Sequence, residues 1–144
     1  MGYLDSLNIT GSALTAERFR TDIIMQNLAN QNTTRTADGG PYRRKQVVFR
    51  ENSLNFKNEL GKAMTRAKDG GVFVEEVVES QNPSVPVYDP DHPDADEDGY
   101  VMMPNVNSAE EMVDLMAASR AYEANVTALN IAKSMALKAL EIGK

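Results

Sequence analysis

The sequence predicts an α+β protein in which a long helix at each end of the chain flanks a small β-rich middle domain. Apolar residues recur at helical spacing near the N-terminus and again, over a longer stretch, near the C-terminus. Between these stretches, short β-prone runs alternate with turns rich in Gly and Pro. We therefore expect an N-terminal helix within residues 1–33, a β-rich domain with long loops over 34–107, and a C-terminal helix over 108–144.

The first expected helix runs from about Tyr3 to Asn30. A row of apolar and small residues from Leu4 to Leu28 advances by three and four residues, and a second row lies beside it. The start is weakly marked, because Gly11 costs about 1 kcal/mol relative to alanine inside a helix. The end is well marked by the polar run Asn30 to Thr34, whose side chains compete with helical hydrogen bonds.

Two apolar stripes mark the C-terminal helix as the clearest element of the chain. Ser108 followed by Glu111 fits a capping box, and Glu110 adds negative charge near the positive end of the helix dipole. From there one stripe keeps heptad spacing from Met112 to Leu140, and a second runs from Ala121 to Ile142. At 1.5 Å per residue, about 33 residues span about 50 Å.

The N-terminal helix can cover only one of these two stripes. We expect the two helices to pair as a coiled-coil-like core, which leaves the second stripe exposed. A large exposed apolar surface marks an interaction site, so the second stripe predicts association with other chains.

The middle domain is expected to hold a small sheet with long loops. Tyr42 to Phe49 and Val72 to Val78 are β-prone runs, each opened by a Gly-Gly pair. Val85 to Tyr88 and Tyr100 to Met103 are shorter, and each lies next to a proline that restricts pairing. Leu54 to Ala67 fits either a short helix or a loop.

Composition excludes several classes of function. The net charge is -6 and the 15 Lys and Arg residues are scattered, which argues against nucleic acid as a partner. The absence of Cys removes disulfides and thiolate chemistry. No apolar run reaches about 20 residues and no basic leader begins the chain, so we expect neither membrane insertion nor a cleaved signal peptide. No nucleophile motif or phosphate loop is present, so we expect no enzyme, cofactor or small-molecule substrate.

Two charged segments could either bind a ligand or serve only local structure. Asp94 to Gly99 matches the first six positions of a calcium loop, but its twelfth position is Asn105 and prolines flank it. A solvated turn held by Asp side chains is the preferred interpretation, with His92 as a turn residue and no metal site. The basic run Arg43 to Lys45 is expected to make only salt-dependent contacts with an acidic neighbour. A secreted calcium-dependent binding module and a two-helix adaptor stay open as alternative functions.

Three blocks of the sequence resemble the axial proteins of the bacterial flagellum. Gly11 to Arg18 leads into Gln26 to Thr33, which looks like the pattern N-x-A-N-x-N-T. The loop Val87 to Asn107 and the end Ala118 to Lys144 are similar to the rod C proteins in particular. The chain thus resembles the flagellar basal-body rod protein family, most closely its proximal-rod C branch.

This resemblance implies a structural role. Such a subunit self-assembles with copies of itself and other rod proteins to transmit torque and to line the export channel. The resemblance further implies a place in the basal-body rod within the periplasmic space, contacts with the basal-body ring and export apparatus, and export without a cleaved signal. The terminal helices would form the axial core, and the middle segment a small outer domain.

We expect the assembly interface to combine apolar residues that supply affinity with polar residues that fix register, because a buried amide or guanidinium is costly without its partner. The alternative is that the polar members are caps and local turns. The apolar members are Leu14, Leu28, Tyr122, Val126, Leu129, Met135 and Leu140, and the polar members are Asn27, Asn30, Asn32, Asn105, Asn107, Arg120 and Asn125.

Overall fold

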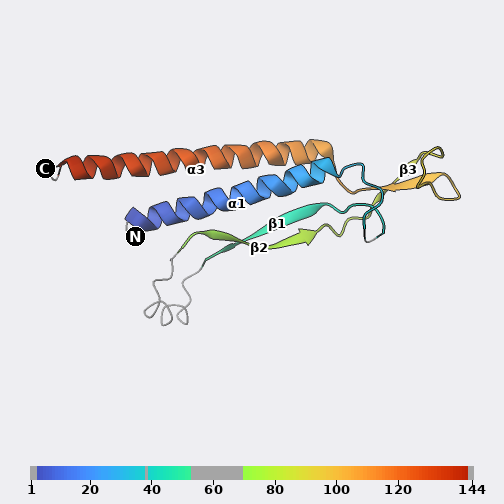
Figure 1. The fold of residues 1–144 in the computed structure, drawn as a ribbon, viewed down its shortest axis with the longest axis horizontal. Helices are drawn as coiled ribbons and strands as arrows, with labels where there is room; N and C mark the ends of the chain where they lie inside the picture. The colour runs from blue at the N-terminus through green and yellow to red at the C-terminus, as the bar shows by residue number, and fades with distance from the viewer. Residues whose placement is uncertain (1–2, 38, 53–69, 143–144) are drawn as a thin grey trace, which may run out of the picture. The chain divides into compact units, whose positions relative to one another are not determined.

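The computed structural model describes residues 3–37, 39–52 and 70–142, and it confirms the α+β class. The elements follow in the order α1 Tyr3–Ala29, β1 Lys45–Glu51, β2 Val72–Glu79, β3 Val85–Tyr88, β4 Tyr100–Met103 and α3 Ser108–Ile142 (Figure 1). The expectation for Leu54 to Ala67 lies outside the described residues. Coiled-coil pairing of the two helices stays a prediction.

The two helices have the bounds that their apolar spacing predicts. α1 spans 27 residues and α3 spans 35, and α1 ends one residue before the expected Asn30. Beyond Ala29 the backbone turns, and the side chain of Asn30 donates to the Gln26 carbonyl oxygen at 2.8 Å. Among the described residues, neither helix has the length and hydropathy needed to span a membrane.

The four strands form two separate two-stranded sheets, so the expectation of one small sheet is wrong. β1 pairs with β2, and β3 pairs with β4. Backbone bonds close both ends of the first pair, from Ser80 N to Arg44 O at 2.8 Å and from Asn52 N to Gly71 O at 3.0 Å. Local sequence predicts that a segment is extended, but pairing depends on which segments later meet.

The register of β3 and β4 explains how a proline fits inside a strand. Pro86 lies opposite Met102 in the antiparallel ladder. The bond from Asp89 N to Gly99 O, at 3.0 Å, makes that pair a hydrogen-bonded one. Hydrogen-bonded pairs alternate with non-bonded pairs along an antiparallel ladder, so Pro86 occupies a non-bonded position and removes no bond.

Contacts divide the chain into two compact units. Unit 1 takes its described residues from Met1–Phe19, Val48–Glu76 and Ala118–Lys144, and unit 2 from Arg20–Val47 and Val77–Ala117. Within unit 1, the hydroxyl of Ser12 on α1 accepts from the backbone N–H of Val72 at 3.1 Å. A Cβ on Gly71 would lie 2.4 Å from that hydroxyl oxygen, so glycine is required where the strand approaches the helix.

Unit 2 holds most of the fully buried residues described. Ile24, Tyr42 and Val101 form its apolar part. Asn27 and Glu111 are buried polar residues, 1% and 0% exposed. A polar group at that depth is stable only with its hydrogen bonds made, so these two residues lead to the candidate site.

Candidate functional site

The side chain of Asn27 makes all four hydrogen bonds that an amide can make. Its Nδ2 donates to the carbonyl oxygen of Lys45 at 2.8 Å and to Oε2 of Glu111 at 2.9 Å. Its Oδ1 accepts from the hydroxyl of Tyr42 and from the backbone N–H of Lys45, both at 2.9 Å. One amide on α1 therefore joins the approach to β1 and the first turns of α3.

Charged side chains extend this network of hydrogen bonds. Nε of Arg44 donates to Oε1 of Glu111 at 2.5 Å, and its Nη2 donates to Oδ2 of Asp114 at 3.0 Å. Nη2 of Arg20 lies 3.6 Å from Oδ1 of Asp114. The expectation that the basic run makes only salt-dependent surface contacts is wrong for Arg44, since its partner Glu111 is fully buried. We call Asn27, Tyr42, Arg44, Glu111 and Asp114 the polar cluster.

Tyr42 lies in the buried part of the polar cluster. Burial raises the pKa of the Tyr42 hydroxyl above its ordinary value of 10.0, and the negative charges of Glu111 and Glu79 raise it further. The hydroxyl thus stays protonated at neutral pH and remains a donor to Asn27. Nζ of Lys45 lies 5.6 Å from the centre of the Tyr42 ring, where a cation is attracted by the ring face.

Asn107, and not Ser108, caps α3. Its Oδ1 accepts from Ala109 N at 3.0 Å, and its carbonyl oxygen accepts from Glu111 N at 3.0 Å. The expected capping box from Ser108 to Glu111 is therefore wrong, because the Glu111 side chain turns inward to Asn27 and Arg44. Ser108 contacts Oε1 of Gln31 instead.

The other polar residues that the sequence predicts also have contacts within the chain or lie at the surface. Oδ1 of Asn105 accepts from Arg44 N and its Nδ2 donates to the Asn82 carbonyl oxygen, both at 2.8 Å. Oδ1 of Asn30 accepts from the Thr33 hydroxyl at 3.2 Å. Exposed members are Asn32 and Arg120, and Asn125 is half-buried. Asn27, Asn105 and Arg44 thus come together, and the role of these residues between subunits stays a prediction.

The apolar residues that the sequence predicts divide into covered and uncovered ones. Leu14, Leu28, Val126 and Leu129 are half-buried. By contrast, Met135 is 66% and Leu140 is 72% exposed. Further exposed apolar side chains on α3 are Met112, Val113, Met116, Tyr122, Ile131 and Leu137.

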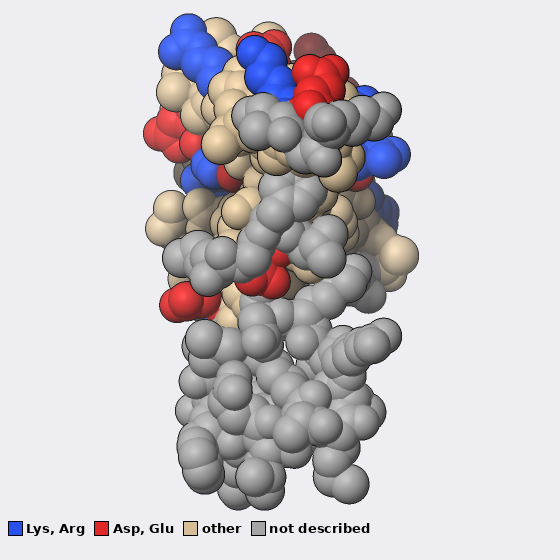
Figure 2. All heavy atoms as spheres, turned by 90° about the vertical axis from the view of Figure 1, so that its left-hand side faces the viewer, with Lys and Arg blue, Asp and Glu red and all other residues tan. Residues whose placement is uncertain are grey.

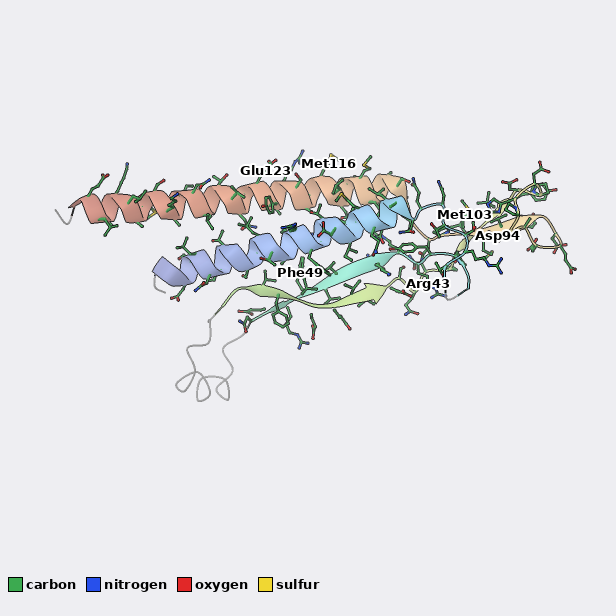
Figure 3. The ribbon with its side chains drawn as sticks, viewed as in Figure 1. Arg43, Phe49, Asp94, Met103, Met116 and Glu123 are labelled. Atoms are coloured by element: carbon green, nitrogen blue, oxygen red, sulfur yellow. The ribbon has the colours of Figure 1, made fainter. Side chains whose placement is uncertain are left out.

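These exposed residues leave α3 with an uncovered apolar surface in the single chain. In Figure 3 the labelled Met116 points outward from α3. Ile131 and Met135 line a shallow groove of about 350 Å³ together with Thr127, Asn130, Ser134 and Lys138. The groove is open to solvent.

The acidic turn between β3 and β4 uses its carboxylates to hold its own backbone. Oδ1 of Asp96 accepts from Asp98 N at 3.1 Å and from Tyr100 N at 2.8 Å. Asp94 accepts from the Thr34 hydroxyl at 2.8 Å and lies 3.7 Å from Nη1 of Arg35. Nδ1 of His92 accepts from Asp94 N at 3.1 Å, as expected of a turn residue. In the part of the chain that the structure describes, no three metal-binding side chains are grouped to hold an ion.

Charges of both signs lie mixed on the end of the chain that Figure 2 turns toward the viewer. On the face in Figure 2, blue Lys and Arg and red Asp and Glu side chains lie interspersed among tan residues. The described residues in this view form no continuous basic stripe of the kind that follows a phosphate backbone.

Sequence reasoning missed four members of the polar cluster: Tyr42, Arg44, Glu111 and Asp114. The available signal was the pairing of opposite charges, with a basic run before β1 and acidic residues in the first turns of α3. Arg44 and Glu111 are 67 positions apart, so nothing local identifies them as partners.

Comparison with known proteins gives consistent matches. Residues 97–142 match the family described as the C-terminal region of the flagellar basal body rod FlgEFG proteins. The chain is 48% identical over 144 residues to the flagellar basal-body rod protein FlgC of Escherichia coli O6:H1, covering 100% of both chains. It is 46% identical to FlgC of Bacillus subtilis, covering 96% of this chain and 97% of the relative, and 45% identical to FlgC of Borreliella burgdorferi, covering 99% and 98%.

Proposed function

The chain belongs to the family of flagellar basal-body rod proteins, and from this premise we propose that the exposed apolar side chains near the end of α3 form the surface by which it packs into the rod. It is a structural subunit of the bacterial flagellar basal body that assembles with other rod components. The observation that carries the proposal is the exposure of Ile131, Met135, Leu137 and Leu140 along one helix.

Burial of this surface supplies the affinity. Each large apolar side chain contributes about 1.5–3 kcal/mol when it passes from water into a packed interface. Helical spacing places Ile131 and Met135 on one side of α3 and Leu137 and Leu140 on another, so two neighbouring helices can cover the four side chains between them. Head-to-tail packing of unlike surfaces gives an open helical array, which is the geometry of a rod.

We further propose that the terminal helices and the middle part of the chain have the different roles that the sequence suggests. Residues 1–33 and 108–144 form the axial core in coiled-coil-like pairing, surround the export channel and transmit torque, while residues 34–107 form an outer domain. The polar cluster supports this proposal because it fixes the end of α1, the start of β1 and the start of α3 to one another. Torque transmission needs such stiff connections and no catalytic group.

A cysteine-protection experiment tests the proposal. The chain has no Cys, so Met135→Cys introduces a single thiol that a maleimide can label. In the bacterium that encodes the chain, the variant replaces the wild-type gene, and labelling is compared between the isolated chain and purified basal bodies. Gln81→Cys, in the exposed β2–β3 connection, is the control.

We expect Met135→Cys to react readily in the isolated chain and to be protected in basal bodies, while Gln81→Cys reacts in both. Equal labelling of Met135→Cys in both states would contradict the proposed packing surface. Absence of the chain from basal bodies would contradict the structural role itself.

A further inference from the structure

One face of the β3–β4 sheet is apolar and exposed. Strand alternation places Pro86, Tyr88, Tyr100 and Met102 on the same side, and we call these four residues the tyrosine face. Tyr88 is 64%, Tyr100 is 44% and Met102 is 46% exposed. On the opposite side of the sheet Val101 is only 2% exposed while Val85 and Val87 are 52% and 43% exposed, so the tyrosine face is the side on which every residue is exposed.

The tyrosine face is built as a fixed surface. The rings of Tyr88 and Tyr100 meet edge to face with centroids 5.3 Å apart. Tyr100 N is bonded to Asp96 at 2.8 Å, and Asp96 N donates to the Tyr100 carbonyl oxygen at 2.9 Å. Gly99 has φ of +79°, and a Cβ there would lie 3.0 Å from the Tyr88 ring. Two rigid aromatic rings presented in this way lose little entropy on binding.

The turn beside this face carries the net charge of the whole chain. Residues 89–98, the acidic turn, contain six Asp and Glu and no Lys or Arg. The chain has 21 acidic and 15 basic residues, a net charge of -6, so the rest of the chain has 15 acidic and 15 basic residues and a net charge of zero. Asp94 and Asp96 hold the turn, while Asp91, Glu97 and Asp98 are exposed beside the apolar face.

We propose that the tyrosine face and the acidic turn together dock a positively charged surface, with an apolar centre, on a basal-body protein other than this chain. The inference rests on the proposed function and adds a second interface, distinct from the packing surface of α3. Charge complementarity identifies the occupant: Lys and Arg of the partner meet the acidic turn while its apolar centre covers the two tyrosines.

A second copy fits poorly, because its remaining surface has no net positive charge and its own acidic turn repels this one. An anionic lipid surface repels the acidic turn, because both are negatively charged.

Photo-cross-linking in assembled flagella tests the proposal. p-Benzoylphenylalanine, an aromatic residue close to tyrosine in shape, replaces Tyr88 in the bacterium that encodes the chain. The matched control carries the same residue at Val85, which is exposed on the opposite side of the sheet. Met102 is a second position on the tyrosine face should the Tyr88 variant not assemble. Mass spectrometry identifies the cross-linked peptide.

We expect Tyr88 to cross-link to a peptide of a different basal-body protein with Lys or Arg nearby, at a yield about fivefold above Val85. The triple variant Asp91→Asn, Glu97→Gln, Asp98→Asn should lower that yield about tenfold, since charge steers and retains the partner. Protection of Met135→Cys should be unchanged, which separates this interface from the packing of α3.

Several outcomes would overturn the inference. They are cross-linking to another copy of this chain, equal yields at Tyr88 and Val85, and a yield that is insensitive to neutralisation of the acidic turn. Absence of any cross-link at both Tyr88 and Met102 in assembled basal bodies would do so as well.

Discussion

Nδ2 of Asn27 donates to Oε2 of Glu111 at 2.9 Å, which joins two buried residues 84 positions apart. The bond links the last turns of α1 to the first turns of α3. Both residues are buried within the single chain, so this connection does not depend on contact with a neighbouring subunit. A rod built from stiff units needs such a connection within each of them.

Asn27→Asp should weaken the fold strongly. The substitution keeps the acceptor for Tyr42 and Lys45 but removes both donors and places a second carboxylate beside Glu111. Buried like charges and lost donors together should lower the free energy of unfolding by about 3 kcal/mol. Urea denaturation of the isolated chain, followed by circular dichroism, measures the change. Asn32→Asp, at an exposed position, should change stability by less than about 0.5 kcal/mol.

The pair Arg44 and Glu111 should show strong coupling. Arg44→Met leaves the buried Glu111 carboxylate without its cation and should lower the free energy of unfolding by about 3–5 kcal/mol. The double variant Arg44→Met, Glu111→Leu should be more stable than Arg44→Met alone, because no uncompensated charge remains. Additive losses in the double-mutant cycle would show that the two side chains act independently.

Two glycines should respond to alanine in opposite directions. Gly71→Ala forces a Cβ against Ser12 at a φ of +100° and should lower the free energy of unfolding by about 1–3 kcal/mol. Gly11→Ala, inside α1 with nothing within 4 Å of the added carbon, should raise it by about 0.5–1 kcal/mol. Thermal unfolding monitored at 222 nm distinguishes the two directions in parallel samples.

Stability should fall in alkaline solution through Tyr42. Its pKa is raised above 10.0 in the folded chain, so above about pH 10 the unfolded chain releases this proton first and binds fewer protons than the folded one. The contribution of Tyr42 to the free energy of unfolding is thus complete below pH 10. It is lost as the pH rises through the pKa of Tyr42 in the folded chain. Tyr42→Phe should remove this part of the pH dependence and cost about 1 kcal/mol at pH 7 through the lost bond to Asn27. Tyr122→Phe, at an exposed site, is the matched control.

Local sequence predicted the elements well and their long-range partners poorly. The bounds of β3, β4 and the start of α3 follow from β-propensity, turn residues and heptad spacing, which are properties of neighbouring residues. The division into two sheets and the inward turn of Glu111 depend on segments that meet only after folding. Asn27 could be singled out as a costly amide, but its partners Tyr42, Lys45 and Glu111 could not.

Assembly of basal bodies from the variant Met135→Lys, Leu140→Lys tests the central claim most directly. Both residues are exposed, and lysine near the C-terminal end of α3 suits the helix dipole, so the isolated chain should keep its helical circular dichroism. Met135→Leu, Leu140→Met keeps the apolar surface and serves as the matched control. We predict that the lysine variant is made at normal levels but is absent from purified basal bodies, and that its cells do not swim. Normal basal bodies and normal swimming with the lysine variant would contradict the claim that the exposed apolar side chains near the end of α3 pack the subunit into the rod.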